Sequence, residues 1–363
     1  TLAFKASAFG RSATLPQRPR LAHHGKALAP LPPRSDCWNT VGMRAVYGSE
    51  PIVVSDAPNP RPQAGEVIID VVAAGVNRAD LLQRAGNYPP PPGASNILGL
   101  EVSGTVSDLG EGVTGWKIGD EVCALLAGGG YAEKVAVPSE QVMPVPRGID
   151  LVSAAALPEV ACTVMSNVVI TGRLAPGELF LAHGGSSGIG THAIQLAHAM
   201  GCRVATTART EAKLARAAEL GADILINYRD DDFTERVRAE GGADVILDIM
   251  GAKYLAGNIA ALATNGRLVI IGMQGGVKAE LNIGALMAKR ASVIGTTLRS
   301  RPTTGGPDSK AAVITETVAR TWPLIESGHI VPVIDFTYPL DEVNAAHARL
   351  QSGDAVGKVL LTM

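Results

Sequence analysis

The spacing of apolar and polar residues changes partway along this chain. From Met43 to about residue 160, short apolar and β-branched runs are broken by clusters of Pro and Gly, which is typical of strands joined by turns. The clearest runs are Arg44–Tyr47, Val67–Ala73 and Glu101–Val106. This pattern predicts a compact, partly barrelled β domain.

The next part of the chain alternates apolar strands with helical stretches. The strands are expected at Leu179–Ala182, Arg203–Thr207, Ile224–Ile226, Val245–Asp248 and Arg267–Ile271. Such alternation predicts a doubly wound parallel sheet, so the expected fold class is α/β. A helical pattern at Asp341–Leu350 and a strand at Gly357–Leu361 are expected to return to the first domain. A ligand cleft is then expected between the domains, above the carboxyl ends of the parallel strands.

Residues 1–42 follow neither pattern. They carry six Lys and Arg residues but a single acid, Asp36, together with many Pro and Ala. We expect this segment to be disordered. One interpretation is a reading frame extended beyond the natural start; the other is an Arg-rich, acid-poor organellar transit peptide. We favour the first.

Composition narrows the class of protein. The 363 residues suffice for two domains, and a net charge of −2 gives no reason to expect nucleic acid or a polybasic membrane anchor. No uninterrupted apolar run approaches the ~18 residues that span a bilayer. The cysteines are scattered without a C-x-x-C pair, which favours a reducing compartment. We expect a cytoplasmic protein without a membrane partner, or an organellar one if residues 1–42 are a transit peptide.

The stretch Leu179–Gly190 joins an apolar strand, a turn of small residues and the start of a helix. The first N–H groups of a helix have no internal partners, and the helix dipole favours negative charge there. Its glycines follow G-x-x-G-x-G rather than the usual G-x-G-x-x-G, so a Gly-rich turn that binds nothing stays open as the alternative. The expected contacts to a dinucleotide pyrophosphate are Gly185, Ser186, Ser187, Gly188 and Ile189.

The end of the second parallel strand indicates which nucleotide binds. An acid at this place would accept from the adenosine ribose hydroxyls and repel a 2′-phosphate, but the strand ends without one. Arg209, Thr210 and Lys213 offer instead two cations and a hydroxyl at a helix start. A solvated helix face is the alternative. We favour phosphate binding, and therefore NADPH over NADH as the cofactor.

Several longer segments resemble one enzyme family. Together they are similar to the zinc-independent quinone oxidoreductases of the medium-chain dehydrogenase/reductase superfamily, especially the tumour-suppressor-induced subgroup; the segments are Gly75–Asp80, Gly86–Glu101, Leu125–Ala132, His183–Gly190, Asn227–Tyr228 and Leu298–Arg301. The resemblance covers about residues 43–363. It implies a GroES-like domain over residues 43–162 plus 300–363, and a Rossmann NADPH-binding domain over residues 163–299.

The same comparison indicates that a catalytic metal is absent. Catalytic zinc needs Cys, His and carboxylate ligands around one open position. The metal-binding Cys position of the zinc alcohol dehydrogenases holds Asn77, and their His-Glu pair reads Leu100-Glu101. The four-cysteine lobe is missing too. We therefore expect no metal site.

The resemblance implies catalytic roles for Tyr88, Ser187 and Asn77. Each has a simpler alternative: an aromatic residue packed on prolines, a pyrophosphate-loop hydroxyl and a capped turn, respectively. Asn77 is also a candidate for the nicotinamide ribose. Further cofactor contacts implied by the resemblance are Thr163, Tyr228, Gly272, Leu298 and Lys358.

The leading hypothesis is a zinc-independent NAD(P)H:quinone oxidoreductase that delivers hydride or electrons to a quinone. A bound nicotinamide supplies the reductant, and a hydrogen-bond donor suffices to stabilise the oxyanion. An NADPH-dependent reductase of α,β-unsaturated carbonyls and a non-catalytic, crystallin-like NADPH-binding protein are the alternatives. A homodimer is expected from the family. The stretch Ala291–Thr296 is either the edge strand that pairs with its copy or an interior strand of one subunit.

Overall fold

A computed structural model describes residues 42–48 and 52–363 of the chain. The expectation of disorder for residues 1–42 falls almost entirely outside the described residues.

The first sheet has seven strands and gathers segments from both ends of the described chain. The order is β14-β15-β3-β4-β5-β7, with β6 paired to β3. The strands are β3 (Glu66–Val76), β4 (Glu101–Leu109), β5 (Glu121–Leu125), β6 (Lys134–Pro138), β7 (Val142–Pro144), β14 (Ile334–Pro339) and β15 (Lys358–Thr362). A separate antiparallel pair is formed by β1 (Met43–Val46) and β2 (Val54–Ala57). The predicted return of the C-terminal strand is confirmed, since β15 pairs antiparallel with β3.

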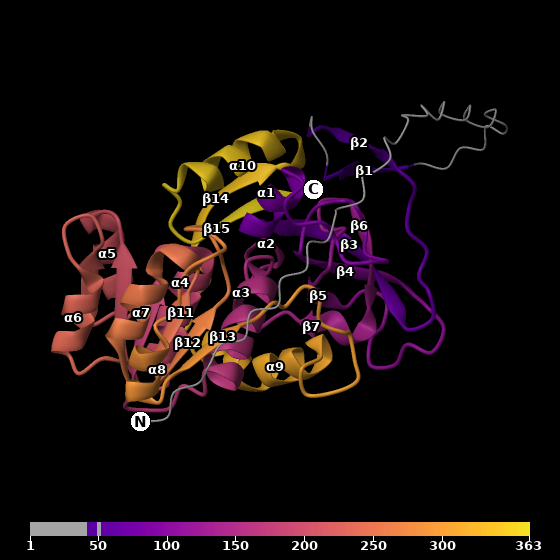
Figure 1. Cartoon of the computed structure of the whole chain (residues 1–363). Coiled ribbons are helices and arrows are strands. Elements are labelled where there is room, and N and C mark those ends of the chain that lie inside the picture. The colour runs from indigo at the N-terminus through magenta and orange to yellow at the C-terminus, as the bar shows by residue number, and fades with distance from the viewer. Residues whose placement is uncertain (1–41, 49–51) are drawn as a thin grey trace, which may run out of the picture. The chain divides into compact units, whose positions relative to one another are not determined.

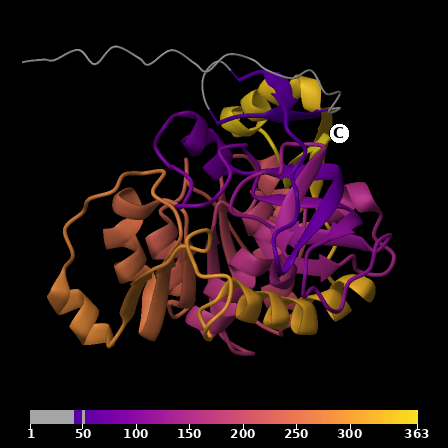
Figure 2. The same ribbon diagram turned by 90° about the vertical axis from the view of Figure 1, so that its right-hand side faces the viewer.

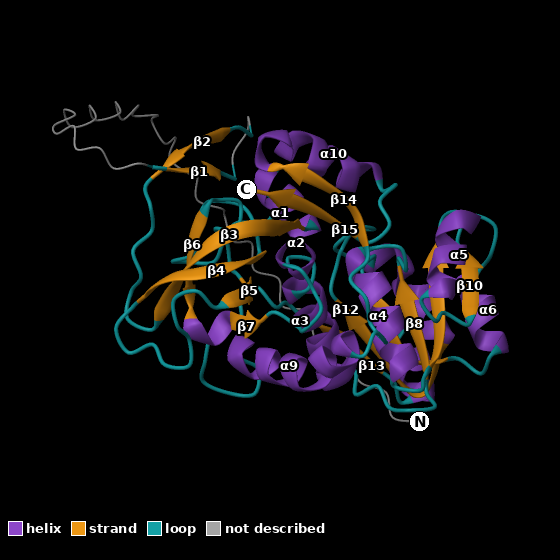
Figure 3. Cartoon of the chain, turned by 180° about the vertical axis from the view of Figure 1, so that it is seen from behind, coloured by secondary structure: helices purple, strands orange, loops and turns teal. Residues whose placement is uncertain are grey.

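The second sheet has six parallel strands in the order β10-β9-β8-β11-β12-β13 (Figures 1 and 3). They are β8 (Leu179–His183), β9 (Arg203–Ala208), β10 (Ile224–Asn227), β11 (Ala243–Asp248), β12 (Leu262–Ile270) and β13 (Ser292–Gly295). The chain reverses its direction of winding between β8 and β11, which is where such folds bind dinucleotides. The predicted fold class is confirmed.

Helices connect and cover the strands of both sheets. Those of the parallel sheet are α4 (Gly188–Ala199), α5 (Glu211–Glu219), α6 (Phe233–Ala239), α7 (Leu255–Ala261) and α8 (Ile283–Lys289). The others are α1 (Arg78–Arg84), α2 (Leu151–Ala154), α3 (Pro158–Val164), the π-helical η2 (Met165–Thr171), α9 (Lys310–Glu326) and α10 (Val343–Ser352). Short 3₁₀ turns lie at Ser139–Gln141, Gly251–Tyr254 and Leu340–Glu342.

The run Leu151–Thr171 passes from one sheet to the other through the core. By length and composition alone it is the one helical run in the described chain apolar enough to cross a membrane, but 83% of its most apolar 18-residue window is buried inside the molecule. One hydrophobic cluster contains Leu125 and Met143 of the first sheet and Phe180 and Val245 of the second. The two sheets therefore share a core, which holds the site between them in a fixed geometry.

The parallel sheet has an open edge at β13, which settles one alternative left by the sequence. In the part of the chain that the structure describes, β13 pairs only with β12, so it is an edge strand and not an interior one. The neighbouring helix α8 has no buried residue, and Ile283 and Met287 are exposed on it. Figure 2 shows this helix, in orange, at the margin of the parallel-sheet domain.

Candidate functional site

The glycine-rich loop, which is predicted to bind an anion, lies at the start of α4. Ser187 is the N-cap: its Oγ accepts from the Gly190 N–H at 3.0 Å and donates to the Gly184 carbonyl at 2.8 Å. Among the described residues, the structure gives the Ile189 N–H no hydrogen-bond partner, whereas Ser187 forms an isolated parallel bridge with Gly357 that engages the Gly188 N–H. A free donor at the positive end of a 12-residue helix suits a pyrophosphate.

The unusual glycine spacing follows from close packing within this loop. A Cβ on Gly185 would lie 2.0 Å from the Thr206 hydroxyl oxygen on β9, and one on Gly190 would lie 2.3 Å from the Gly184 carbonyl. A Cβ on Gly188 would lie 2.5 Å from the Lys358 side chain. Each glycine thus permits a different contact, and the loop lies directly against β15.

Lys358 lies at the centre of a buried polar cluster that three distant segments build. Its ammonium donates to Glu101 Oε1 at 2.5 Å, to Asn77 Oδ1 at 2.7 Å and to the Val76 carbonyl at 3.2 Å. Asn77 Nδ2 donates to the same Glu101 oxygen at 2.8 Å. The Lys358 and Glu101 side chains are 5% and 0% exposed. The predicted residues Asn77 and Lys358 are therefore in direct contact, and both donate to the same carboxylate oxygen.

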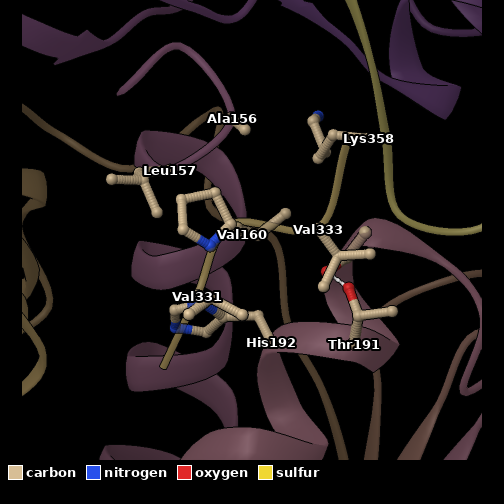
Figure 4. Close-up of a pocket in the computed structure, with 10 residues that line it drawn as sticks. Ala156, Leu157, Val160, Thr191, His192, Val331, Val333 and Lys358 are labelled. Atoms are coloured by element: carbon tan, nitrogen blue, oxygen red, sulfur yellow. Dashed lines mark hydrogen bonds between the residues drawn. The ribbon is translucent and has the colours of Figure 1, made fainter. Parts of the chain in front are cut away.

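A small pocket connects this cluster to the glycine loop (Figure 4). Lys358 and Gly188 line it together with Thr191 of α4 and Val160 of α3. The hydrogen bond drawn in the figure runs from the Thr191 hydroxyl to the Gly188 carbonyl, at 3.0 Å. The glycine loop and the polar cluster are therefore neighbours in space.

Two further carboxyl groups with shifted pKa values lie near the cluster. Burial raises the pKa of Asp80 to about 6, against the opposing effect of hydrogen bonds from the Asn77 and Gly99 N–H groups and the Tyr131 hydroxyl. Burial, and then the charge of Glu101, raise the pKa of Glu159 to about 8. The Glu159 N–H donates to Glu101 Oε2 at 2.8 Å. Sequence reasoning did not single out Asp80 or Glu159.

Tyr88 lies where loops of the two domains meet. Its hydroxyl is 3.4 Å from the Thr297 hydroxyl, beyond β13, and the Arg299 guanidinium lies 5.1 Å from the centre of its ring. The ring thus contacts Arg299, a cation–π arrangement. Leu298, between these partners, is 7% exposed. Tyr88 therefore contacts the segment that follows β13 through both its hydroxyl and its ring.

Arg209 and Lys213 already have partners in the segment between α10 and β15. Arg209 pairs with Asp354 and donates to the Ser352 carbonyl at 3.2 Å, while the Lys213 ammonium donates to the Gly353 carbonyl at 2.6 Å. The same segment reaches the glycine loop, because the Gly357 N–H donates to the Ser186 carbonyl at 2.8 Å. The alternative of a solvated helix face does not describe Lys213, which is 8% exposed.

Three of the other predicted contacts follow the carboxyl ends of strands in the parallel sheet: Thr210 after β9, Tyr228 after β10 and Gly272 after β12. Thr163 is buried in α3, one turn after Glu159, and Thr210 is the N-cap of α5. Tyr228 is 42% exposed just after β10. A Cβ on Gly272 would lie 2.6 Å from the Ile249 carbonyl, so that loop also packs tightly.

Comparisons with known proteins point to one family. The alcohol dehydrogenase GroES-like domain matches residues 63–147, and the zinc-binding dehydrogenase family matches residues 188–311. The chain is 31% identical over 314 residues to the quinone oxidoreductase of Rattus norvegicus, covering 85% of this chain and 92% of that protein. It is 33% identical over 332 residues to that of Lama guanicoe, covering 88% and 98%.

The solved structures include one with a cofactor. The Escherichia coli quinone oxidoreductase complexed with NADPH superposes with a TM-score of 0.78 and 29% identity, over 89% of this chain and 99% of that one. In that relative the nucleotide is NADPH, the cofactor that Arg209 and Lys213 favoured on sequence grounds.

Proposed function

This chain belongs to the quinone oxidoreductase family of the medium-chain dehydrogenase/reductase superfamily, and we propose that it reduces quinones with NADPH and without a metal ion. The observation that carries the proposal is the buried contact of Lys358 with Asn77 and Glu101. A zinc site needs thiolate or imidazole ligands around an open position. Here an amide, a carboxylate and an ammonium satisfy one another instead.

The loop and the second strand supply the groups that would hold NADPH. The Ile189 N–H and the positive end of the α4 dipole suit the pyrophosphate, and Arg209 and Lys213 suit the 2′-phosphate. When bound, the cofactor supplies a hydride to an electron-poor acceptor. The 2′-phosphate would have to replace Asp354 at Arg209, so binding and the segment 352–355 are coupled.

The chain's own residues then bind the acceptor and stabilise the charge that it gains. A reduced quinone oxygen is an oxyanion, which a preorganised hydrogen-bond donor stabilises. The Tyr88 hydroxyl is the donor proposed for this oxygen, with Arg299 fixing the ring. Ser187 has both its hydroxyl roles filled within the loop, so we propose that it shapes the pyrophosphate site. Asn77, fixed by Lys358 and Glu101, is proposed to contact the ribose or the substrate.

We further propose a homodimer that forms through β13. An unpaired strand edge is a template for pairing with a second copy. Exposed apolar residues lie beside it on α8 and the preceding loop: Met273, Val277, Leu281, Ile283 and Met287. Pairing of two β13 edges would cover them about a two-fold axis.

Steady-state oxidation of NADPH with a panel of quinones and enals tests the function. The expected result is turnover with quinones that is unchanged by a chelator. Turnover with enals alone would favour the unsaturated-carbonyl reductase. Tight NADPH binding without turnover on any acceptor would favour the non-catalytic protein. Loss of activity with the chelator and its return with Zn²⁺ would overturn metal independence.

A further inference from the structure

A second, larger cavity lies away from the residues assigned to NADPH and to catalysis. It has a volume of about 820 Å³, within the ~300–1,000 Å³ range of small-molecule pockets. Segments around Pro91–Ile97, Leu126–Gly129 and Arg299–Thr303 form its walls, with β6. None of the predicted cofactor or catalytic residues lines it.

The charged residues that line this cavity are mostly cations. They are Glu66, Lys134, Arg299, Arg301 and Lys310. Lys134 is paired with Asp70. The lining therefore has an excess of positive charge, which favours an anionic ligand.

Lys310 is the residue that most needs such a ligand. It is 4% exposed, and within the described ranges its ammonium has no hydrogen-bond partner or ion pair; because this nitrogen is not among the fully buried polar atoms, it keeps contact with solvent. A largely buried cation that only solvent satisfies is stabilised by a charge-assisted hydrogen bond to an anion. Burial lowers the pKa of Lys310, although the nearby Glu159 acts in the opposite direction.

Arg299 adds a second, fixed cation to the same wall. It is 6% exposed, and its Nε donates to the Ala127 carbonyl at 2.9 Å and its Nη2 to Gln83 Oε1 at 2.6 Å. These bonds use neutral acceptors, so the guanidinium charge is not neutralised by them. Apolar groups complete the lining, among them Pro92, Ile97 and Leu126.

We propose that this cavity is a binding site for a small organic anion, with its carboxylate or phosphate group on Lys310 and its apolar body against the proline loop. Lys310 supplies the charge-assisted hydrogen bond and Arg299 the supporting field. Because Arg299 also contacts Tyr88, its guanidinium is shared between the proposed anion site and the substrate side of the protein.

Calorimetric titration of the full chain, with and without saturating NADPH, tests the site. The probes are benzoate, phenyl phosphate and, as the uncharged control, benzyl alcohol, all at constant ionic strength. We expect at least one anionic probe to bind with one equivalent, and benzyl alcohol to bind at least tenfold more weakly. Benzoate and phenyl phosphate distinguish a carboxylate site from a phosphate site.

The variants locate the binding. K310M should weaken the anionic probe at least tenfold, K310R should keep its affinity within threefold, and K117M, at an exposed lysine outside the cavity, should change nothing. If K310M does not fold, protection of Lys310 from an amine-reactive label by the probe gives the same information in the unaltered protein. Binding that is equal in K310M, absence of protection, or no binding of either anion would overturn the proposal.

Discussion

The glycine loop and the lysine cluster are neighbours in the molecule, but the chain builds them in opposite ways. The loop comes from one continuous stretch, Leu179 to Gly190, whose strand and turn already lead to the positive end of a helix. The cluster joins Asn77, Glu101 and Lys358 from three distant segments, and it exists only when β15 pairs with β3. The geometry of the loop can thus form locally, whereas the buried polar cluster depends on the tertiary fold.

The largest expected effect comes from breaking the lysine cluster. K358M leaves the buried Glu101 carboxylate without its cation, which should lower the free energy of unfolding by about 3–5 kcal/mol. Urea denaturation followed by circular dichroism measures this change. The double variant K358M/E101Q should recover part of the loss, because no uncompensated charge then stays buried. A single variant as stable as the original would show that the pair does not hold this part of the fold.

Arg209 and Lys213, which follow the glycine loop in the chain, test which nucleotide binds. Replacing Arg209 by Ala and Lys213 by Met should weaken NADPH about 100-fold, since both charge-assisted contacts to a phosphate are lost. The affinity for NADH should change less than threefold. R216A, on the outer part of α5, is the matched control. Fluorescence titration measures both nucleotides, and an equal loss for both would contradict the 2′-phosphate assignment.

The difference between a loop built from one stretch and a cluster built from three distant segments also explains what the sequence could predict. The family, the fold class and the strands of the parallel sheet were predicted and are confirmed, because apolar periodicity and loop chemistry are local signals. The resemblance also identified Asn77 and Lys358, but nothing in the sequence indicated that they contact each other and share Glu101. Glu159 was missed because its raised pKa comes from burial beside Glu101, 58 residues away in the chain.

Not every prediction has been tested. The catalytic and cofactor roles of single residues, the domain limits at residues 162 and 299, the cytoplasmic location and the dimer stay predictions. These properties depend on bound ligands, partner chains or the cell, and no local pattern determines them.

Glu159 offers a test of the cluster's electrostatics through pH. Because its pKa is raised to about 8 in the folded state, the folded protein keeps a proton that the unfolded chain releases above about pH 4.5. The wild-type free energy of unfolding should therefore fall as the pH rises from 4.5 to 8. E159Q cannot ionise, so it should be more stable than the wild type by about 1–3 kcal/mol at pH 8.5 and equally stable at pH 4.

Denaturation curves at several pH values give this comparison, with E140Q, at an exposed carboxyl, as the control. A shallower slope should survive in E159Q below pH 6, because the pKa of Asp80 is raised to about 6. Parallel curves for E159Q and the wild type would mean that Glu159 ionises normally in the folded protein.

The smallest effect is expected at Tyr88, where the two domains meet. Y88F keeps the ring on Arg299 and removes only the hydroxyl, so stability and NADPH affinity should not change. If that hydroxyl stabilises the oxyanion, kcat with a quinone should fall about tenfold, corresponding to ~1.4 kcal/mol, with little change in KM. T297V removes the hydroxyl partner at 3.4 Å and should have a smaller effect. A rise in KM at unchanged kcat would instead make Tyr88 a residue that binds substrate, because the lost interaction would then be the same in the ground state and the transition state.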